Sequence, residues 1–546
     1  MLRLIGSMTV MALLMVGCGD DASPPQPPPA TYTVGGTVTG LSGPGLVLQI
    51  GGGNDLPISA SGAFTFATGM PSGTSYAVTV KSSPTSPLQV CLVADGVGTI
   101  AAADVTNVDV TCTSARRYTI RGTVSGLQGS GLVLQIVVPG GRGHPGHDIG
   151  PPVPITSNGP FTIVESAPTG SNGLVAVISQ EPASPSQPCL VHNAINFQAG
   201  NVTDSEVGCS QFAYVANAGD NTVSAYTIDA ATGALTALPG FPVGAGTSPF
   251  AIVGTQDRKY VFVGNEGSND ISSFAVNFVS GALTPVPGSP FASGTDPQGM
   301  ALDGSTLYVA NAGSDTVSAF TIDYNTGALT TLPGSPVPVG KNPTSIVVDP
   351  ITGVVFVANH GGSNDISAFN SFDPLTPVPG SPFPAGGNPL SMEFGAGGNF
   401  LFTANPDATN PSVSGFSFDP ATGTLSPLSG SPFPLPVSHY MAIEQTGIQF
   451  GSNSISGYLY VTTDASIVGY AFDWTTGALT ALPGFPVATG ANAYSVHILG
   501  NQFLYVANDG AANISGFTLD LLTGALTPMA GSPFPAGNHP KFIATF

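Results

Sequence analysis

Leu307-Tyr308-Val309-Ala310-Asn311 begins the repeating unit that decides the fold of this 546-residue chain. The stretches Thr316-Val317-Ser318-Ala319-Phe320 and Thr326-Gly327-Ala328-Leu329-Thr330 complete the unit. The first stretch has six further copies, which are Tyr214–Asn217, Phe262–Asn265, Phe356–Asn359, Phe402–Asn405, Tyr460–Thr462 and Tyr505–Asn508. Most copies follow one another at roughly 46 to 48 residues, a spacing typical of β-propeller blades. The sequence therefore predicts an all-β fold with a seven-bladed β-propeller over residues 211–546.

Each unit also holds a strand that usually opens with proline, as in Pro343–Val347. The other members of this series are Pro249–Val253, Pro297–Ala301, Pro389–Glu393, Tyr440–Glu444, Tyr494–Ile498 and Pro540–Ala544. We interpret this strand as the innermost strand of a blade and as the start of that blade. The propeller then begins at Phe212 with a second strand, so we expect His539–Phe546 to pair with blade one and close the ring.

The Tyr/Phe-Val-Ala-Asn and Thr-Gly-Ala-Leu-Thr segments resemble those of YVTN-motif propellers and of the lactonase-like propeller family, in which 6-phosphogluconolactonase is the named enzyme. The resemblance covers roughly Phe212 to Phe546. It implies a seven-bladed propeller and, as an activity, opening of a lactone ring at the central funnel. Family members that act on anionic substrates are expected to use Arg and His there. Within this range the one arginine is Arg258, in a turn that we expect on the opposite face.

Two related modules precede the propeller. Tyr32–Leu41 is echoed by Tyr118–Leu127, and Gly45–Ile50 by Gly131–Ile136. Apolar side chains alternate with polar ones in several of their segments, and turn residues separate these segments, which is typical of half-buried strands. We expect two small antiparallel β-sandwiches over residues 32–113 and 114–210. They resemble immunoglobulin-like or transthyretin-like modules of bacterial surface proteins.

The N-terminus carries the features of an export signal. Arg3 precedes the apolar run Leu4–Val16, which is too short for a permanent membrane span. Met15-Val16-Gly17-Cys18 resembles the bacterial lipoprotein cleavage box, so we expect a signal peptide over residues 1–17 and lipidation of Cys18. The alternative is an ordinary secreted protein with a stray cysteine. Residues 18–31 are proline-rich and should act as a spacer, which together predicts an exported lipoprotein anchored to a membrane of the bacterial cell envelope.

The cysteines support this interpretation. Of five, Cys18 stands alone, whereas Cys91 with Cys112 and Cys189 with Cys209 fall at matching places in the two modules. We therefore expect the disulfides Cys91–Cys112 and Cys189–Cys209. Each closes a loop of about 20 residues, which stabilises the fold by about 3 kcal/mol if the effect is chain entropy.

The charge excludes one class of partner. The net charge of −21, from 31 acidic and 10 basic side chains, repels phosphate backbones, so we expect no nucleic-acid binding. The hydrophobic fraction of 42% argues against disorder. The expected partners are a protein or a carbohydrate at the cell surface, together with the membrane through the lipid anchor. The sequence predicts no oligomeric state.

Candidate functional residues lie where the copies of the repeat differ. The residue just before each inner strand should line the mouth of the funnel; these residues are Ser248, Asp296, Asn342, Asn388, His439, Ala493 and His539. Deeper along the inner strands we place Glu393 and Glu444 at equivalent positions of consecutive blades, with His497 one position earlier. The repeated asparagines and the loop acids Asp220, Asp270, Asp315 and Asp365 are interpreted as turn residues, and His360 as solvated.

Two functions follow from these residues. The leading interpretation is a surface-displayed binding or scaffold protein, because the funnel is poor in charge. The alternative is a lactone-ring hydrolase in which Glu393 or Glu444 is the base for water and His439 or His539 shuttles the proton. In a variant of the hydrolase, Ca²⁺ lies on the axis, held by Asp296, Asn342, Asn388 and Glu393.

Overall fold

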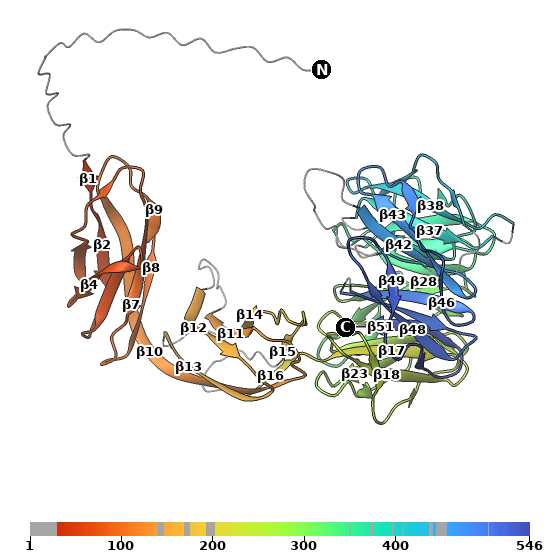
Figure 1. Cartoon of the computed structure of the whole chain (residues 1–546), viewed down its shortest axis with the longest axis horizontal. Helices are drawn as coiled ribbons and strands as arrows, with labels where there is room; N and C mark the ends of the chain where they lie inside the picture. The colour runs from red at the N-terminus through yellow and green to blue at the C-terminus, as the bar shows by residue number, and fades with distance from the viewer. Residues whose placement is uncertain are drawn as a thin grey trace, which may run out of the picture. The chain divides into compact units, whose positions relative to one another are not determined.

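A computed structural model describes eleven segments of the chain. They are residues 30–138, 147–168, 175–192, 202–349, 351–371, 375–395, 398–407, 409–435, 441–443, 456–500 and 502–545. The chain divides into two compact units, one of Met1–Tyr118 with Glu165–Ser171 and one of Thr119–Val164 with Asn172–Phe546. Strands are the regular elements of the described segments (Figure 1). No helix that could cross a membrane occurs in them.

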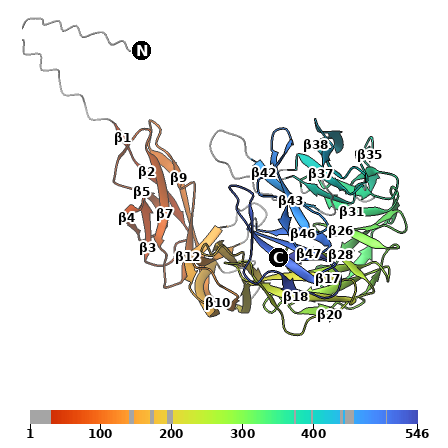
Figure 2. The same ribbon diagram turned by 45° about the vertical axis from the view of Figure 1, so that its right-hand side comes forward.

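Seven sheets with one common strand order form the predicted propeller, which is confirmed (Figure 2). In the third sheet, β26 (Pro297–Asp303), β27 (Thr306–Asn311), β28 (Thr316–Ile322) and β29 (Leu329–Thr331) pair in chain order, and the short β30 (Val337–Pro338) also pairs with β28. β27 and β28 contain the Tyr-Val-Ala-Asn and Val-Ser-Ala-Phe segments of the repeat. These segments are buried because both faces of each sheet pack on neighbouring sheets.

The other sheets repeat this order. They are β21 (Pro249–Gly254), β22 (Tyr260–Asn265), β23 (Asp270–Val276), β24 (Leu283–Pro285) and β25 (Phe291–Ala292); β31 (Pro343–Val348), β32 (Val355–Asn359), β33 (Asp365–Asn370), β34 (Thr376–Pro377) and β35 (Phe383–Pro384); β36 (Ser391–Phe394), β37 (Phe400–Asn405), β38 (Ser412–Asp419), β39 (Thr424–Pro427) and β40 (Phe433–Pro434); β41 (Met441–Ile443), β42 (Ser456–Thr462), β43 (Ser466–Asp473), β44 (Leu479–Ala481) and β45 (Val487–Ala488); and β46 (Ala493–Leu499), β47 (Phe503–Asn508), β48 (Asn513–Leu519), β49 (Leu526–Pro528) and β50 (Phe534–Pro535).

The first sheet joins the two ends of the propeller. It consists of β17 (Gln211–Asn217), β18 (Thr222–Ile228), β19 (Leu235–Ala237), β20 (Val243–Gly244) and, as its inner strand, β51 (Pro540–Thr545). Tyr214 pairs with Ala544 and Val215 with Ile543 in an antiparallel ladder. The predicted closure of the ring by the C-terminal strand is therefore confirmed.

The asparagine of the repeat joins two strands inside six of the seven blades. Asn311 is fully buried, and its Nδ2 donates a hydrogen bond to Ser318 Oγ at 2.9 Å while its Oδ1 accepts one from the Gly294 N–H at 3.1 Å. The amide-to-serine bond has the same length in five other pairs, which are Asn217–Ser224, Asn265–Ser272, Asn359–Ser367, Asn405–Ser414 and Asn508–Ser515. The interpretation of these asparagines as turn residues was wrong, because they link two strands and a loop.

In three blades the tyrosine of the repeat, Tyr214, Tyr460 or Tyr505, links the blade to the next one. Tyr214 Oη donates to the carbonyl oxygen of Gly281 at 2.8 Å, and Tyr505 Oη donates to that of Gly233 at 2.7 Å. Both glycines belong to the tight turn before the fourth strand of the following blade. Gly233 has φ +73°, and a Cβ there would lie 2.5 Å from Met529, so only glycine fits. The second of these bonds joins the seventh blade to the first.

The first N-terminal module has two sheets around one core. One sheet has the order β4 (Gly53–Ile58), β3 (Leu46–Ile50), β7 (Ser75–Ser82) and β9 (Val97–Thr99), and the other includes β5 (Gly62–Thr65), β2 (Val34–Thr39), β10 (Val105–Ser125) and β8 (Gln89–Ala94); β1 (Thr31–Tyr32) pairs with β6 (Met70–Pro71). Val34, Leu48 and Val108 are fully buried between them. Because β2 and β10 pair in parallel, the prediction of a wholly antiparallel sandwich was wrong.

The second module has a similar arrangement. One sheet has the order β12 (His147–Ile155), β11 (Leu132–Val138) and β14 (Val175–Gln180), while β15 (Leu190–His192), β16 (Val202–Gly208) and β13 (Gly159–Pro168) belong to the sheet of β10. Here too β10 pairs in parallel, with β16. The predicted boundary between residues 113 and 114 lies inside β10.

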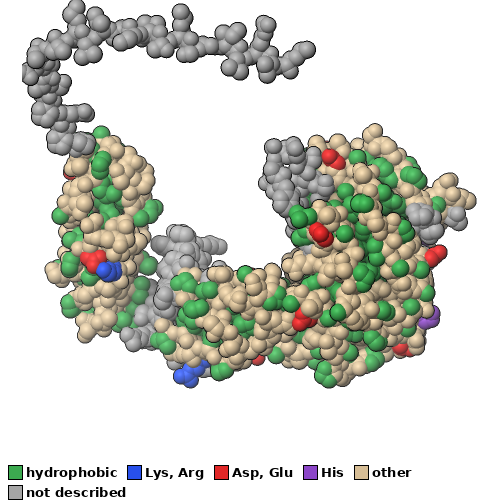
Figure 3. All heavy atoms as spheres, in the orientation of Figure 1, with side chains coloured by type: hydrophobic (Ala, Val, Ile, Leu, Met, Phe, Trp, Pro, Cys, Tyr) green, Lys and Arg blue, Asp and Glu red, His purple; other side chains and the backbone are tan. Residues whose placement is uncertain are grey.

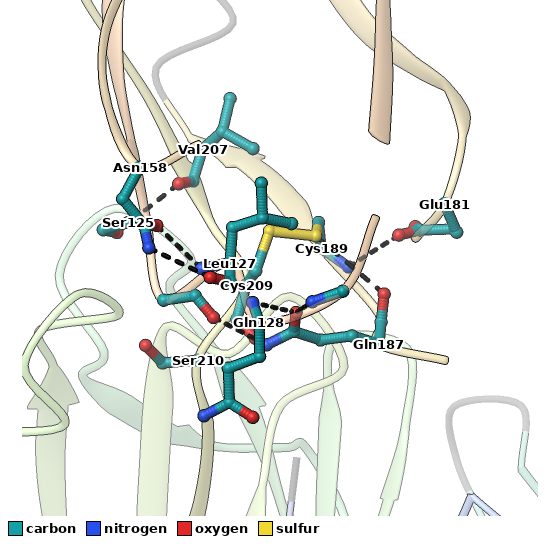
Figure 4. Close-up of a disulfide and its surroundings, with 12 residues drawn as sticks. Ser125, Leu127, Gln128, Asn158, Glu181, Gln187, Cys189, Val207, Cys209 and Ser210 are labelled. Atoms are coloured by element: carbon teal, nitrogen blue, oxygen red, sulfur yellow. Dashed lines mark hydrogen bonds between the residues drawn. A yellow bond between two sulfur atoms is a disulfide. The ribbon is translucent and has the colours of Figure 1, made fainter. Parts of the chain in front are cut away.

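Both predicted disulfides, Cys91–Cys112 and Cys189–Cys209, are present. Beside the second one, the buried Gln187 donates from Nε2 to the carbonyl oxygens of Gly126 and Cys209, both at 2.6 Å (Figure 4). Its Oε1 accepts from the Gln128 N–H at 2.9 Å. Gln89 makes the matching bonds in the first module. In each module a buried glutamine thus holds a loop next to the disulfide.

Ring closure predicts a specific loss of stability. Ile543 of β51 is 4% exposed, whereas Ile351 in the turn before β32 is 73% exposed. We expect Ile543→Ala to lower the free energy of unfolding by about 2 to 5 kcal/mol, because it leaves a cavity in the closing strand. We expect the matched change Ile351→Ala to stay within about 0.5 kcal/mol of wild type.

Deletion of residues 540–546 should lower the melting temperature further than either substitution, as followed by circular dichroism. Equal melting curves for the deletion variant and the wild type would mean that β51 does not stabilise the ring.

Candidate functional site

Few charged side chains are visible on the face of the molecule in Figure 3, and charged residues make up 8% of the sequence. Because charged side chains are rare, those near the propeller axis mark candidate functional sites. They lie in two places. One is the end at which the inner strands begin, which we call the mouth, and the other is a cavity among the inner strands, which we call the axial cavity.

Backbone hydrogen bonds build the mouth from two positions of each blade. The residue before the inner strand accepts a hydrogen bond from the residue that follows the repeat asparagine. The Glu266 N–H donates to the Ser248 carbonyl oxygen at 2.9 Å, and the Asp509 N–H donates to that of Asn492 at 2.8 Å. The residues before the inner strands have φ between 51° and 58°; they are Ser248, Asp296, Asn342, Asn492 and His539.

The seventh blade corrects one member of the predicted ring. Ala493 pairs with Asn508 in the way that Pro297 pairs with Asn311. Ala493 therefore takes the place of the opening proline, and Asn492 is the residue at the mouth. His439 lies outside the described residues.

A buried aspartate orients the exposed His539. Nδ1 of His539 lies 3.2 Å from Oδ1 of Asp509. Asp509 is 8% exposed and also accepts from Asn492 Nδ2, whereas the His539 side chain is 60% exposed. Nε2 of His539 has no hydrogen-bond partner among the described residues. An imidazole held at one nitrogen by a carboxylate can exchange a proton at the other.

Two further carboxyl groups lie near each other at the mouth. Ser248 Oγ donates to Glu266 Oε2 at 3.3 Å, and Gln298 Nε2 donates to both carboxylate oxygens of Asp296 at 3.3 Å. Burial and then the neighbouring Asp296 raise the pKa of Glu266, while the charge of Lys541 lowers it in part. Glu266 thus keeps a proton to higher pH than an exposed glutamate does.

Lys541 links these groups. Its Nζ lies 3.0 Å from Asp509 Oδ1 and 4.3 Å from the centre of the Tyr494 ring. The charge of Lys541 also lowers the pKa of Glu266 in part, so one cation interacts with both acidic groups. The sequence analysis missed Lys541, Asp509 and Glu266. A comparison of the residue after each asparagine could have found the two acids, since Ala218 and Ala312 occupy that position in other blades.

The fourth blade places His360 at the mouth as well. Its Nε2 lies 3.4 Å from Nδ2 of Asn388. Burial lowers the pKa of His360, so the interpretation of this residue as solvated was wrong. The loop acids hold backbone at the rim: Asp315 Oδ1 accepts from the Asn342 N–H at 2.9 Å, and Asp220 Oδ2 accepts from the Asn538 N–H at 2.6 Å.

The axial cavity has a volume of about 620 Å³ and is lined by inner strands. Glu393 and His497 are the ionisable side chains of its described lining. They occupy the same register position, because Glu393 pairs with Phe402 and His497 with Tyr505. The corresponding residues of the other blades are Val253, Ala301, Val347, Ala442 and Ala544. The predicted equivalence of Glu393 with Glu444 was therefore wrong, and Glu444 lies outside the described residues.

Burial shifts both groups of the axial cavity toward their uncharged forms. It raises the pKa of Glu393 from 4.5 to about 7 and lowers the pKa of His497 from 6.5 to about 4. Neither side chain has a hydrogen-bond or ion-pair partner among the described residues. At neutral pH His497 is uncharged, while Glu393 is partly ionised.

The structure does not bring the predicted catalytic and calcium-binding residues together. His539 precedes β51, and the residue of β51 that corresponds to Glu393 is Ala544, five positions further on. Five residues of a strand span about 16 Å, so Glu393 lies far below the mouth residues His539, Asp296 and Asn388. No group of three His, Cys, Asp or Glu side chains that could hold a metal ion occurs among the described residues.

Arg258 does not line either place. It is 8% exposed and donates from Nη1 to the Ser210 carbonyl oxygen at 3.2 Å. A phosphate at the mouth would therefore not meet an arginine among the described residues.

The comparisons with known proteins agree with this architecture. The Lactonase, 7-bladed beta-propeller family model matches residues 191–290 and 287–371. A Bacteroides uniformis protein, named as a candidate 6-phosphogluconolactonase, has a similar structure with a TM-score of 0.52 and 18% identity, over 62% of this chain and 99% of that one. A Bacteroides fragilis protein named in the same way has a TM-score of 0.50 and 19% identity, over 62% and 98%. At this identity the likeness shows the fold. No curated protein matches the chain.

The pKa shifts in the axial cavity predict opposite effects of pH. Folded Glu393 keeps a proton that the unfolded chain loses above pH 4.5, so its contribution to stability falls as pH rises toward 7. Folded His497 stays unprotonated while the unfolded chain gains a proton below pH 6.5, so its contribution falls as pH drops toward 4. We therefore expect the difference in melting temperature between Glu393→Gln and the wild type to shift in favour of the variant as pH rises from 4.5 to 7.

The control is His497→Gln. The difference in melting temperature between this variant and the wild type should shift in favour of the variant as pH drops from 6.5 to 4. Melting temperatures of each variant and the wild type that differ by a constant amount at every pH would contradict both shifts.

Proposed function

We propose that this chain is a hydrolase that opens a lactone ring at the mouth of the propeller. One observation carries the proposal: His539 is held by the buried Asp509 next to Lys541, with the carboxyl group of Glu266 nearby. The family match and the fold shared with proteins named as candidate 6-phosphogluconolactonases support it.

Each of these residues has a separate role in the proposed reaction. Nε2 of His539 takes a proton from water as the water oxygen attacks the lactone carbonyl carbon. The ammonium of Lys541 stabilises the negative charge that develops on the carbonyl oxygen. When the ring C–O bond breaks, the protonated carboxyl of Glu266 gives its proton to the departing alkoxide. The product is the hydroxy acid, and the proton on His539 returns to solvent or to Glu266.

The charge of the mouth favours an unphosphorylated lactone. Lys541 is paired with Asp509, and Lys341 beside the fourth inner strand is paired with Asp315. Asp296 adds negative charge, and the net charge of the chain is −21. A phosphate would be repelled here, whereas a neutral sugar lactone would not.

The remaining predictions from the sequence stand as proposals. Export, lipidation of Cys18 and anchoring in the cell envelope rest on residues outside the described segments. The role as a surface-binding or scaffold protein has no support in the comparisons, which favour the hydrolase. An immunoglobulin-like origin of the two modules also remains a proposal.

The mouth predicts a pattern of activity in variants. With the purified full-length protein and a panel of neutral aldonolactones, we expect His539→Gln and Asp509→Asn each to lower kcat/KM by about 10²-fold or more, because general base catalysis contributes that much. Release of acid, followed with a pH indicator, measures the rate.

The matched control is Glu393→Gln, which lies in the axial cavity and should keep wild-type activity. Hydrolysis no faster than in buffer across the panel would refute the function. Full activity in His539→Gln would refute the assignment of the mouth.

A further inference from the structure

The axial cavity forms a second site that the reaction at the mouth does not use. Rings from three inner strands, Phe250, Tyr494 and Phe542, pack together with centroid distances of 5.4 to 6.2 Å. They come from blades two, seven and one, the blades that carry the His539 and Lys541 group. Phe542 also lines the cavity, whereas His539, Lys541, Asp509 and Glu266 do not.

The other end of the cavity reaches the surface. Gln256, in the turn between β21 and β22, is exposed and also lines the cavity. Gly398, in the turn between β36 and β37, lines the same end. A ligand thus has access from the face opposite the mouth. A volume of about 620 Å³ is in the range of sites for small molecules.

The walls combine aliphatic side chains with hydroxyl and amide groups, and they contain one ionisable acid. Val253, Ala301 and Val347 stand at the register position of Glu393 and His497. Glu393 is without a hydrogen-bond or ion-pair partner among the described residues, and the described lining contains no lysine or arginine. A carboxylate in such surroundings is unfavourable until a cation or a donor reaches it, and the attraction is stronger than in water.

We propose that the axial cavity binds a small organic cation, an ammonium group on an apolar body, with Glu393 as its counter-ion. The apolar body packs on the aliphatic walls. The neutral imidazole of His497, on the blade next but one, offers a further hydrogen-bond partner. An organic anion is excluded by Glu393, by the lack of a cationic side chain in the described lining and by the net charge of −21.

Three probes of one shape and different charge test this site: 2-phenylethylammonium, 2-phenylethanol and phenylacetate, titrated into the full-length protein by calorimetry at pH 7.5. We expect the ammonium to bind at least about tenfold more tightly than the alcohol, and phenylacetate not to bind. Tighter binding of phenylacetate, or no binding of the ammonium at millimolar concentration, would overturn the proposal.

Variants locate the binding. Glu393→Gln should weaken the ammonium about tenfold or more and leave the alcohol within about twofold, whereas Glu266→Gln at the mouth should leave both unchanged. Ala301→Leu narrows the cavity without changing its charge and should weaken both probes, which keeps the test valid if Glu393→Gln does not fold. Ammonium binding that is unaffected by Ala301→Leu, or that is lost only in Glu266→Gln, would place the cation elsewhere and refute the site. None of these outcomes depends on lactone hydrolysis.

Discussion

The buried amide of the repeat asparagine is the interaction on which the propeller depends. In the third blade, Asn311 joins β27 to β28 through Ser318 and joins both to the loop before the inner strand β26 through Gly294. Each such bond contributes about 1 kcal/mol, but an unpaired buried amide would cost about 1 to 3 kcal/mol. The bond to serine is present in all six blades that carry the asparagine, which explains why these two residue types recur together, whereas the bond to glycine is made by Asn265 and Asn311.

This interaction also decides where function can lie. Next to the amide, in five blades, a backbone hydrogen bond joins the residue after the asparagine to the residue before the inner strand and brings both side chains to the mouth. Those two positions do not take part in the buried amide bonds, so their side chains can vary without cost to the blade. Ser248 with Glu266 and Asn492 with Asp509 show the result. The repeated residues thus form the scaffold of the blades, and the residues that differ between blades carry the charged groups of the mouth.

The sequence predicted the propeller, its closure by β51 and both disulfides because these depend on patterns repeated along the chain. It failed where one blade departs from the pattern. Ala493 replaces proline at the start of β46, so without the proline as a marker the sequence misplaced the mouth residue by one. In the sixth blade, Ala442 rather than Glu444 pairs with Tyr460. Side-chain pairs such as His539 with Asp509 join blades at the two ends of the chain order, which no local pattern can reveal.

The two polar places on the axis differ in how their charges are balanced. At the mouth, Lys541 lies between Asp509 and Glu266, so acid and base are already paired and the site is accessible to water. In the axial cavity, Glu393 has no counter-ion among the described residues. Since a carboxyl group on an inner strand costs stability there, and alanine or valine occupies the same position in five other blades, packing alone does not explain Glu393. A ligand that supplies the missing positive charge would explain it, and that ligand and the lactone would contact different side chains, because His539, Lys541 and Asp509 do not line the axial cavity.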